Sequence, residues 1–304
     1  MPTGKILTTS HENRIDDRFG EEALSRAKIC IEKYTKKWKL HDVKFIEFYS
    51  ASLLFECIAP EFGPSILKIH MGINDLKREI KALSLFGLNY VCEVYRYSEE
   101  SEICLLERIT PGETLFHKTT RKERVGLFCN IHSQLHTSRI KTSSFPTYLE
   151  CINESYRAIS SRMDCEPISH LLHEAKEMVV SINYKYNQSF LLHGDLHHEN
   201  ILKNQFGGYT IVDPLGYVGD PIFDISRFVI VECKDLVSEP LENIIEILQM
   251  LSYKMSIPVR VLKECLFIET VIRLFYEKLR VGELLSNHEY LLRSVSVAKK
   301  INTL

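Results

Sequence analysis

The chain has 304 residues, of which 45% are hydrophobic and 26% are charged, so it is long enough to bury a large core or to form two lobes. Its formal net charge of −2 gives no indication of a general affinity for nucleic acid or for an anionic membrane. The nine cysteines lack paired CxxC spacing, which favours reduced thiols over a disulfide framework. Residues 1–17 lack the apolar core of a signal peptide, and no apolar run is long enough to span a bilayer, so we expect a cytoplasmic protein.

The first third of the chain carries a helical pattern followed by several β-rich segments. Apolar residues recur at helical spacing between Leu24 and Tyr34 and predict an amphipathic helix. Short polar or Pro/Gly-containing stretches separate the β-rich segments, which predicts an antiparallel meander. A second helix is expected to begin at a cap, Asn74. Its buried face is expected to include Leu76, Ile80, Leu83 and Leu85. The expected elements are a helix over 21–37, strands over 43–48, 53–58 and 65–69, a helix over 74–86, and strands over 90–98 and 103–107.

The segment Thr110-Pro111-Gly112-Glu113 breaks the β pattern and marks a boundary between two lobes, residues 1–109 and 110–304. Beyond it, apolar residues recur at spacings of three and four and predict a helical lobe. The expected helices cover residues 120–138, 148–161, 168–182, 222–231, 239–253, 259–280 and 282–300. The helix over 259–280 carries three acidic residues that either contribute to a pocket for a polycationic substrate or form a solvated face, and we favour the solvated face for each. These residues are Glu264, Glu269 and Glu277.

The most informative stretch is residues 191–202, Leu-Leu-His-Gly-Asp-Leu-His-His-Glu-Asn-Ile-Leu. Two apolar runs, 201–203 and 209–212, flank a Gly/Asn tract and predict two antiparallel strands joined by a turn. This hairpin would place Asn200 beside Asp213, with Asp195 on the loop that leads in. An amide oxygen and a carboxylate suit Mg²⁺, which takes few protein ligands. Asp195 is then free to orient a hydroxyl nucleophile.

An Asp, an Asn five residues later and a second Asp after a hairpin form the arrangement of the protein-kinase catalytic loop. The segment His193-Gly194-Asp195 replaces the usual His-Arg-Asp, and with the His-His-Glu-Asn-Ile-Leu that follows, it resembles the aminoglycoside phosphotransferase family. The run from Val212 to Pro221 is most similar to the streptomycin 6-phosphotransferase and hydroxyurea phosphotransferase branch of that family. The strong match covers residues 191–228, and weaker features extend it over most of the chain.

The resemblance implies an α+β, protein-kinase-like two-lobed fold, with an antiparallel β-sheet N-lobe and a mainly helical C-lobe. It implies transfer of the γ-phosphate of ATP or GTP to a hydroxyl of a small molecule. Streptomycin or a related, cationic aminoglycoside is the first choice of acceptor, which gives antibiotic inactivation. Asp195 would accept or orient the hydroxyl proton, while Asn200 and Asp213 would hold Mg²⁺. Asp224 would brace the catalytic loop by accepting backbone N–H bonds.

The same resemblance implies a nucleotide site in the N-lobe. Lys68 lies in an apolar strand, where an ammonium group needs a partner, and it would contact the nucleotide phosphates while Glu79 of the next helix fixes it. The loop between the first two strands, with Ser50 and Ser52, would bring backbone N–H groups to the phosphates, although it has no glycine. At the hinge, Glu107 and Ile109 would bind the purine through their backbone.

Other interpretations of these residues remain open. His193, His197 and His198 could bind zinc in a hydrolase, but this leaves Lys68 and the Asn200–Asp213 pair without roles. A polar loop on a purely structural hairpin is a second alternative. Within the kinase interpretation, the acceptor could be hydroxyurea or another metabolite. A nucleotide-binding pseudokinase is disfavoured because the chain retains Lys68, Asp195, Asn200 and Asp213.

Overall fold

The computed structural model describes residues 6–49, 52–72, 75–87, 89–117, 120–137, 139–140, 145–160, 166–234, 236–281 and 288–303. The chain forms two compact units, the first comprising residues 1–112 and 203–215 and the second residues 113–202 and 216–304. The expected boundary at 109/110 lies close to the first change of unit, whereas the return of 203–215 to the first unit was not anticipated.

The first unit is built on a five-stranded sheet in the order β1-β2-β3-β5-β4, in which all neighbours are antiparallel. The strands are β1 (His41–Tyr49), β2 (Ser52–Ala59), β3 (Gly63–His70), β4 (Val94–Ser98) and β5 (Ile103–Glu107). The predicted meander is therefore confirmed. Only β4 is clearly shorter than expected, because residues 90–92 bond to another segment, described below.

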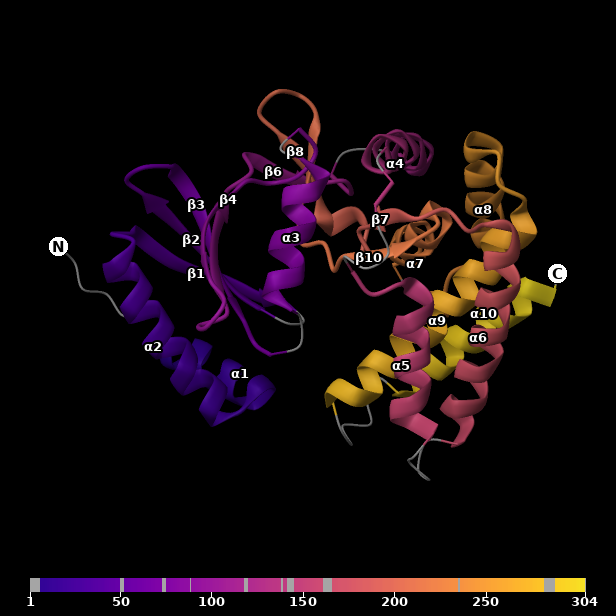
Figure 1. Cartoon of the computed structure of the whole chain (residues 1–304), viewed down its shortest axis with the longest axis horizontal. Coiled ribbons are helices and arrows are strands. Elements are labelled where there is room, and N and C mark those ends of the chain that lie inside the picture. Colours follow the sequence, from indigo (N-terminus) through magenta and orange to yellow (C-terminus); the bar gives the residue numbers. More distant parts are fainter. Residues whose placement is uncertain are drawn as a thin grey trace. The chain divides into compact units, whose positions relative to one another are not determined.

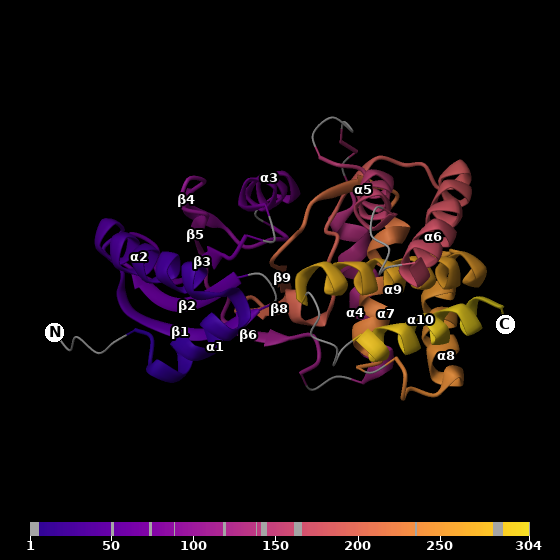
Figure 2. The same cartoon turned by 90° about the horizontal axis from the view of Figure 1, so that it is seen from below.

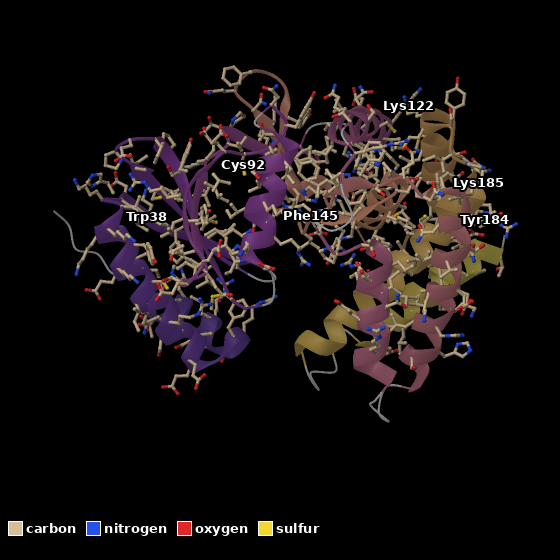
Figure 3. The ribbon with its side chains drawn as sticks, viewed as in Figure 1. Trp38, Cys92, Lys122, Phe145, Tyr184 and Lys185 are labelled. Carbon is tan, nitrogen blue, oxygen red and sulfur yellow. The ribbon has the colours of Figure 1, made fainter. Side chains whose placement is uncertain are left out.

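Helices cover the two faces of this sheet (Figure 1). On one face lie α1 (Thr9–Phe19) and α2 (Glu21–Lys37), and on the other lies α3 (Leu76–Phe86). Leu67 and Ile69 of β3 belong to the same buried cluster as Ile31 and Tyr34 of α2. Because side chains alternate along a strand, Lys68 points to the opposite face, toward α3. Trp38, buried at the end of α2, packs its ring 4.7 Å from that of Tyr34 (Figure 3).

Two features of these helices differ from the expectation. The helix α1 was not predicted; it begins at a capping box between Thr8 and His11, and its Ile15 is fully buried. The cap of α3 is Asp75, whose side chain accepts from the N–H of Arg78 at 3.2 Å. Asn74, the predicted cap, lies outside the described residues.

The second unit is mainly helical. Its helices are α4 (Arg121–Leu135), α5 (Tyr148–Ser160), α6 (Glu166–Lys185), α7 (Ser226–Glu232), α8 (Leu241–Met255), α9 (Val259–Val281) and α10 (His288–Thr303). The predicted helices are thus present, with shifted ends. The helix α9 packs against α6 and α10 (Figure 2), and also against α5, α7 and α8. No helix in the described part of the chain is both long enough and apolar enough to cross a bilayer.

The helix expected over 222–231 is divided in two. A 3-10 helix, η4 (Pro221–Asp224), begins at the cap Asp220, whose side chain accepts from the N–H of Ile222 at 3.3 Å. The α-helix α7 starts only after it, at Ser226. This early turn places Asp224 and its carboxylate at the junction of the two pieces.

Short strands carry the motif segment. In the second unit, β7 (Phe190–Leu192) pairs antiparallel with β10 (Tyr217–Gly219) and leads to the 3-10 helix η3 (His198–Asn200). The strands β6 (Pro111–Thr114), β8 (Ile201–Asn204) and β9 (Tyr209–Ile211) form a sheet in the order β6-β8-β9. The predicted hairpin is therefore confirmed, and Asn204 N–H donates to the Gly208 carbonyl at 2.9 Å across its turn. The breaker expected at residues 110–113 instead carries most of β6.

Candidate active site

The first unit places Lys68, Glu79 and Asp213 in one cluster. Lys68 Nζ lies 2.9 Å from each carboxylate oxygen of Glu79, so the predicted pair is present. Lys68 Nζ also donates to Oδ1 of Asp213, a contact that was not predicted. His70 Nε2 lies 2.9 Å from Glu79 Oε2. Both Lys68 and Glu79 are buried, with 3% of each residue exposed.

Each charged group of this cluster stabilises the ionised form of its partners. Burial alone would lower the pKa of Lys68, but the charges of Asp213 and Glu79 raise it above its ordinary value. Burial alone would raise the pKa of Glu79, but Lys68 and His70 lower it to about 2. Lys68 is therefore a permanent cation and Glu79 a permanent anion at neutral pH.

Asp213 joins the first unit through the segment that precedes it. Ile211 N–H donates to the Tyr90 carbonyl at 2.8 Å, and Cys92 N–H donates to the Ile211 carbonyl at 3.1 Å. Asp213 then adopts a left-handed backbone with φ of 62°, which is uncommon for a non-glycine residue. The Asp213 side chain remains 37% exposed, whereas that of Glu79 is 3% exposed.

The other nucleotide-site candidates lie on the same sheet. Ser52 begins β2, where it pairs with Tyr49 and His70, whereas Ser50 lies outside the described residues. Glu107 ends β5, and its side chain accepts from the backbone N–H of Glu93 at 3.1 Å, a role that the sequence did not suggest. Ile109 follows as a buried residue.

The second unit positions the loop that carries Asp195. Asp224 accepts from the backbone N–H of His193 at 2.6 Å and from that of Gly194 at 2.7 Å. His136, which follows α4 as its C-cap, contacts Oδ2 of the same carboxylate through its Nε2 at 2.9 Å. Burial alone would raise the pKa of Asp224, but His136 lowers it below the ordinary value. The predicted brace of the loop by Asp224 is thus present.

The side chain of Asp195 is held by an arginine and a histidine. Arg227 Nε on α7 donates to its Oδ1, and His197 Nε2 lies 3.5 Å from its Oδ2. Burial alone would raise the pKa of Asp195, but the charges of Arg227 and His197 hold it well below its usual range. Asp195 is therefore an ionised carboxylate and a weak base. The role of Arg227 was missed, because its partner lies 32 residues away in the chain.

Asn200 is fixed within the same unit. Its Nδ2 donates to the carbonyl of Asp195 at 2.9 Å, and the residue is buried with 8% exposed. This contact uses the amide nitrogen, so the carbonyl oxygen stays available as a ligand. Asn200 and Asp213 belong to different units, and their expected juxtaposition stays a prediction.

The three histidines of the motif have separate partners. His193 Nδ1 accepts from the N–H of Asp195 at 3.2 Å, and His197 Nδ1 accepts from the N–H of Glu199 at 3.3 Å. His198 Nε2 lies 2.7 Å from the Glu232 carboxylate. Within the described ranges, no three His, Cys, Asp or Glu side chains are grouped to hold one metal ion. The contacts of the three histidines support the loop and η3.

A buried acid lies behind Arg227. Glu269 of α9 was expected on a solvated face, which is wrong: only 7% of the residue is exposed. Tyr148 Oη lies 3.0 Å from its Oε2, and Arg227 Nε lies 3.8 Å from its Oε1. Burial raises the pKa of Glu269 to about 7, although the charge of Arg227 opposes this shift. Glu264 is partly buried, with 18% of its side chain exposed, and Glu277 lies outside the described side chains.

Three solved structures share this fold. A choline kinase LicA from Streptococcus pneumoniae superposes with a TM-score of 0.62 at 16% identity, covering 92% of this chain and 99% of that chain. An ethanolamine kinase of Plasmodium vivax superposes with a TM-score of 0.69 at 11% identity, covering 98% of this chain and 96% of that chain. A thermostable mutant of aminoglycoside phosphotransferase APH(4)-Ia, in complex with AMP-PNP and hygromycin B, superposes with a TM-score of 0.61 at 14% identity. The match covers 89% of this chain and 98% of that chain. The predicted α+β, protein-kinase-like fold is confirmed.

Sequence comparison is more specific than the fold. The streptomycin 6-kinase of Streptomyces griseus is 24% identical to this chain over 203 residues, which is 64% of each protein. The match thus spans less than two thirds of that relative's length. A family model described as aminoglycoside/hydroxyurea antibiotic resistance kinase matches residues 37–270, which is more than half of the chain. The chain therefore belongs to the aminoglycoside/hydroxyurea antibiotic resistance kinase family.

Proposed function

We propose that the protein is a phosphotransferase that moves the γ-phosphate of ATP or GTP to a hydroxyl of a small molecule. The observation that carries this proposal is the buried Lys68–Glu79 pair with Asp213 in one unit. The other unit supplies Asp195 on a braced loop with Asn200. These are the groups that phosphoryl transfer requires, and the chain's family supports the same chemistry.

In this proposal Lys68 aligns the nucleotide. Glu79 and Asp213 hold its ammonium group in place, so the cation is already positioned before the phosphates arrive. A preorganised charge stabilises the transferring phosphoryl group without reorganisation during the reaction. Backbone groups of Ser50, Ser52, Glu107 and Ile109 complete the nucleotide site.

The donor set fits Mg²⁺, with Asn200 and Asp213 as the residues that would hold it. Lys68 engages Oδ1 of Asp213, so that Oδ2 remains for a cation, and the amide of Asn200 retains its carbonyl oxygen. Oxygen donors of this kind are those that Mg²⁺ prefers. When bound, the metal ion would offset the negative charge of the phosphates.

Asp195 would orient the acceptor hydroxyl. Its low pKa makes it a poor proton acceptor but a permanent hydrogen-bond acceptor. This suits a loose, metaphosphate-like transition state, in which little proton removal is needed before the phosphoryl group is transferred. Positioning of the hydroxyl, more than its deprotonation, is then the contribution of Asp195.

For the acceptor, an aminoglycoside such as streptomycin is the first candidate. The family's description and the name of the Streptomyces griseus relative support this choice. The acceptor would then be cationic, and the protein would inactivate an antibiotic. Hydroxyurea is the second candidate, because the family's description names it.

The test is transfer of labelled γ-phosphate from ATP and from GTP to streptomycin, other aminoglycosides, hydroxyurea and simple polyols. We expect Mg²⁺-dependent labelling of streptomycin. Labelling of another acceptor alone would support the phosphotransferase and reject streptomycin. Nucleotide binding without transfer to any acceptor would contradict the proposed activity and favour a pseudokinase.

A further inference from the structure

Arg227 has no assigned role in the proposed reaction, yet it contacts Asp195 directly. Its Nε donates to Oδ1 of Asp195 and also lies 3.8 Å from Oε1 of Glu269. Its side chain is 18% exposed, and in the described part of the chain its buried Nη1 has no hydrogen-bond partner. Two carboxylates therefore determine where this guanidinium lies.

The second of these carboxylates is itself anchored. Tyr148 of α5 donates its hydroxyl to Glu269 Oε2 at 3.0 Å, and both residues are 7% exposed. The Tyr148 ring stacks on Phe223 of η4, with ring centroids 4.4 Å apart and an interplanar angle of 18°. Packed rings and a buried hydrogen bond leave Glu269 little freedom to move. A continuous chain of contacts thus connects α5, α9 and α7 to the loop of Asp195.

The contact leaves the two oxygens of Asp195 in different situations. Oδ1 is engaged by Arg227, whereas among the described residues Oδ2 has only the Nε2 of His197, at 3.5 Å. A carboxylate with one oxygen tied to a rigid guanidinium is held in one rotamer and presents its other oxygen in a fixed direction. A shift of about 1 Å in such a group can cost on the order of 100-fold in rate.

We infer that Arg227 is a positioning residue, which holds the Asp195 carboxylate toward the acceptor hydroxyl, and that Glu269 and Tyr148 fix Arg227 in that place. The inference rests on the proposed phosphotransferase activity. A merely structural ion pair would contribute to stability and leave the turnover rate unchanged.

The first experiment measures kcat, the acceptor KM and the nucleotide Kd of Arg227→Gln and Arg227→Lys. We expect Arg227→Gln to lower kcat by roughly 10- to 100-fold, as for other positioning defects. Nucleotide Kd should stay within about twofold, because the nucleotide site lies on other residues. Arg227→Lys keeps the charge but not the planar guanidinium, so its kcat should lie between those of the native protein and Arg227→Gln. The matched control is Arg260→Gln, which removes an Arg–Glu pair at an 86% exposed side chain of α9 and should leave kcat unchanged.

The anchors give a graded version of the same test. Glu269→Gln should lower kcat less than Arg227→Gln does, and Tyr148→Phe should lower it least, because each acts through the next residue. Their controls are Glu264→Gln, on the same helix, and Tyr253→Phe, whose residue is 89% exposed. Anchor variants with lower kcat than Arg227→Gln itself would contradict this order.

The second experiment does not depend on turnover. Thermal unfolding midpoints are compared for Asp195→Asn, Arg227→Gln and the double variant. If the two side chains pair, the unfolding midpoint of the double variant should fall by less than the sum of the decreases in the two single variants. Additive shifts would overturn the inference, and so would coupled shifts with native kcat in Arg227→Gln. If the native protein transfers phosphate to no acceptor, the proposed function fails and the role of Arg227 falls with it. If the native protein transfers phosphate and Arg227→Gln does so at the full native rate, the proposed function stands and only the inference about Arg227 fails.

Discussion

Glu232, at the end of α7, has a fully buried side chain that contacts two arginines and a histidine. Its Oε1 lies 2.5 Å from Arg124 Nη2 and 3.2 Å from Arg121 Nε, and its Oε2 lies 2.7 Å from His198 Nε2. The His198 ring is stacked between two aromatic rings, with centroids 4.1 Å from that of Phe116 and 4.4 Å from that of Phe228. This buried acid therefore holds η3, which carries Asn200.

We predict that Glu232→Gln destabilises the protein in a pH-dependent way. Burial alone would raise the pKa of Glu232, but its bonds to Arg124 and His198 lower it from 4.5 to about 2. This difference between the pKa values of the unfolded and folded states corresponds to a contribution of about 3 kcal/mol to the free energy of unfolding at neutral pH. Since the folded pKa is the lower one, this stabilisation is complete above pH 4.5 and is lost as the pH falls toward 2. The measurement is thermal unfolding of both proteins between about pH 7 and pH 3.

The difference between the unfolding midpoints of the native protein and the variant should shrink over the acidic part of that range. Glu289→Gln removes a surface pair whose glutamate side chain is 74% exposed, and it should leave the midpoint nearly unchanged at every pH. A difference between native protein and Glu232→Gln that is independent of pH would contradict the assignment.

Single residues were predictable where their partners lie in the same motif. Lys68 and Glu79 are 11 residues apart, in a strand and the next helix, and their pairing followed from the resemblance to kinases. Glu269 was misassigned because its partner Tyr148 lies 121 residues away. A signal was present nonetheless: Glu269 interrupts a mostly apolar run from Cys265 to Val271, and an acid in such a run needs a partner if the run is buried.

At the scale of elements, the sequence predicted those with a strong period. The strands of the first sheet and the helices of the second unit follow alternating or three-to-four spacing of apolar residues. Their ends agree to within four residues, apart from the start of α10, where the expected residues 282–287 lie outside the described part of the chain. The helix α1 was missed because its capping box has His11 at the position where Glu or Gln is the usual signal. Its burial depends on Ile15, which packs on the core that α2 and the sheet form.

The orientation of α3 was only partly predicted. Leu83 is buried as expected, with 2% exposed, whereas Leu85 is 49% exposed. The buried face of α3 instead includes Glu79 and Ala82, because the Glu79 side chain points inward to contact Lys68. A charged residue on the inner face is not visible in a hydrophobic pattern.

This orientation predicts different costs for two equal truncations. Leu83→Ala should lower the free energy of unfolding by about 2–5 kcal/mol, because it leaves a cavity in the core. Leu85→Ala, on the same helix, should change it by less than about 1 kcal/mol. Chemical denaturation of both variants measures the difference. Equal losses would contradict the described face of α3.

At the scale of the whole molecule, the chain crosses between the two units more than once. Residues 203–215 belong to the first unit although the residues on both sides belong to the second. Asp213 thereby folds with Lys68, and Asn200 folds with Asp195. The Pro/Gly breaker of the sequence lies next to the first crossing, whereas the return depends on the pairing of Val91 with Ile211, 120 positions apart in the sequence.

This division predicts that a nucleotide with Mg²⁺ stabilises the protein through the cluster of Lys68. At a ligand concentration of about 100 times its Kd, binding should add about 2.7 kcal/mol to stability. Removal of the metal ion with EDTA should remove most of the increase in the unfolding midpoint. Lys68→Met should abolish the increase, whereas Lys77→Met, at a 73% exposed lysine of α3, should retain it. A full increase in Lys68→Met would contradict the nucleotide role of this cluster.

The central claim is that Asp195 acts on the acceptor while the groups around Lys68 act on the nucleotide. The most direct measurement compares Asp195→Ala with the native protein in two assays, Mg²⁺-dependent nucleotide binding and transfer of labelled γ-phosphate to the acceptor. We predict native-like nucleotide binding and no detectable transfer, since loss of such a group costs several powers of ten. A folded Asp195→Ala variant that no longer binds the nucleotide, or that transfers phosphate at the native rate, would contradict the account.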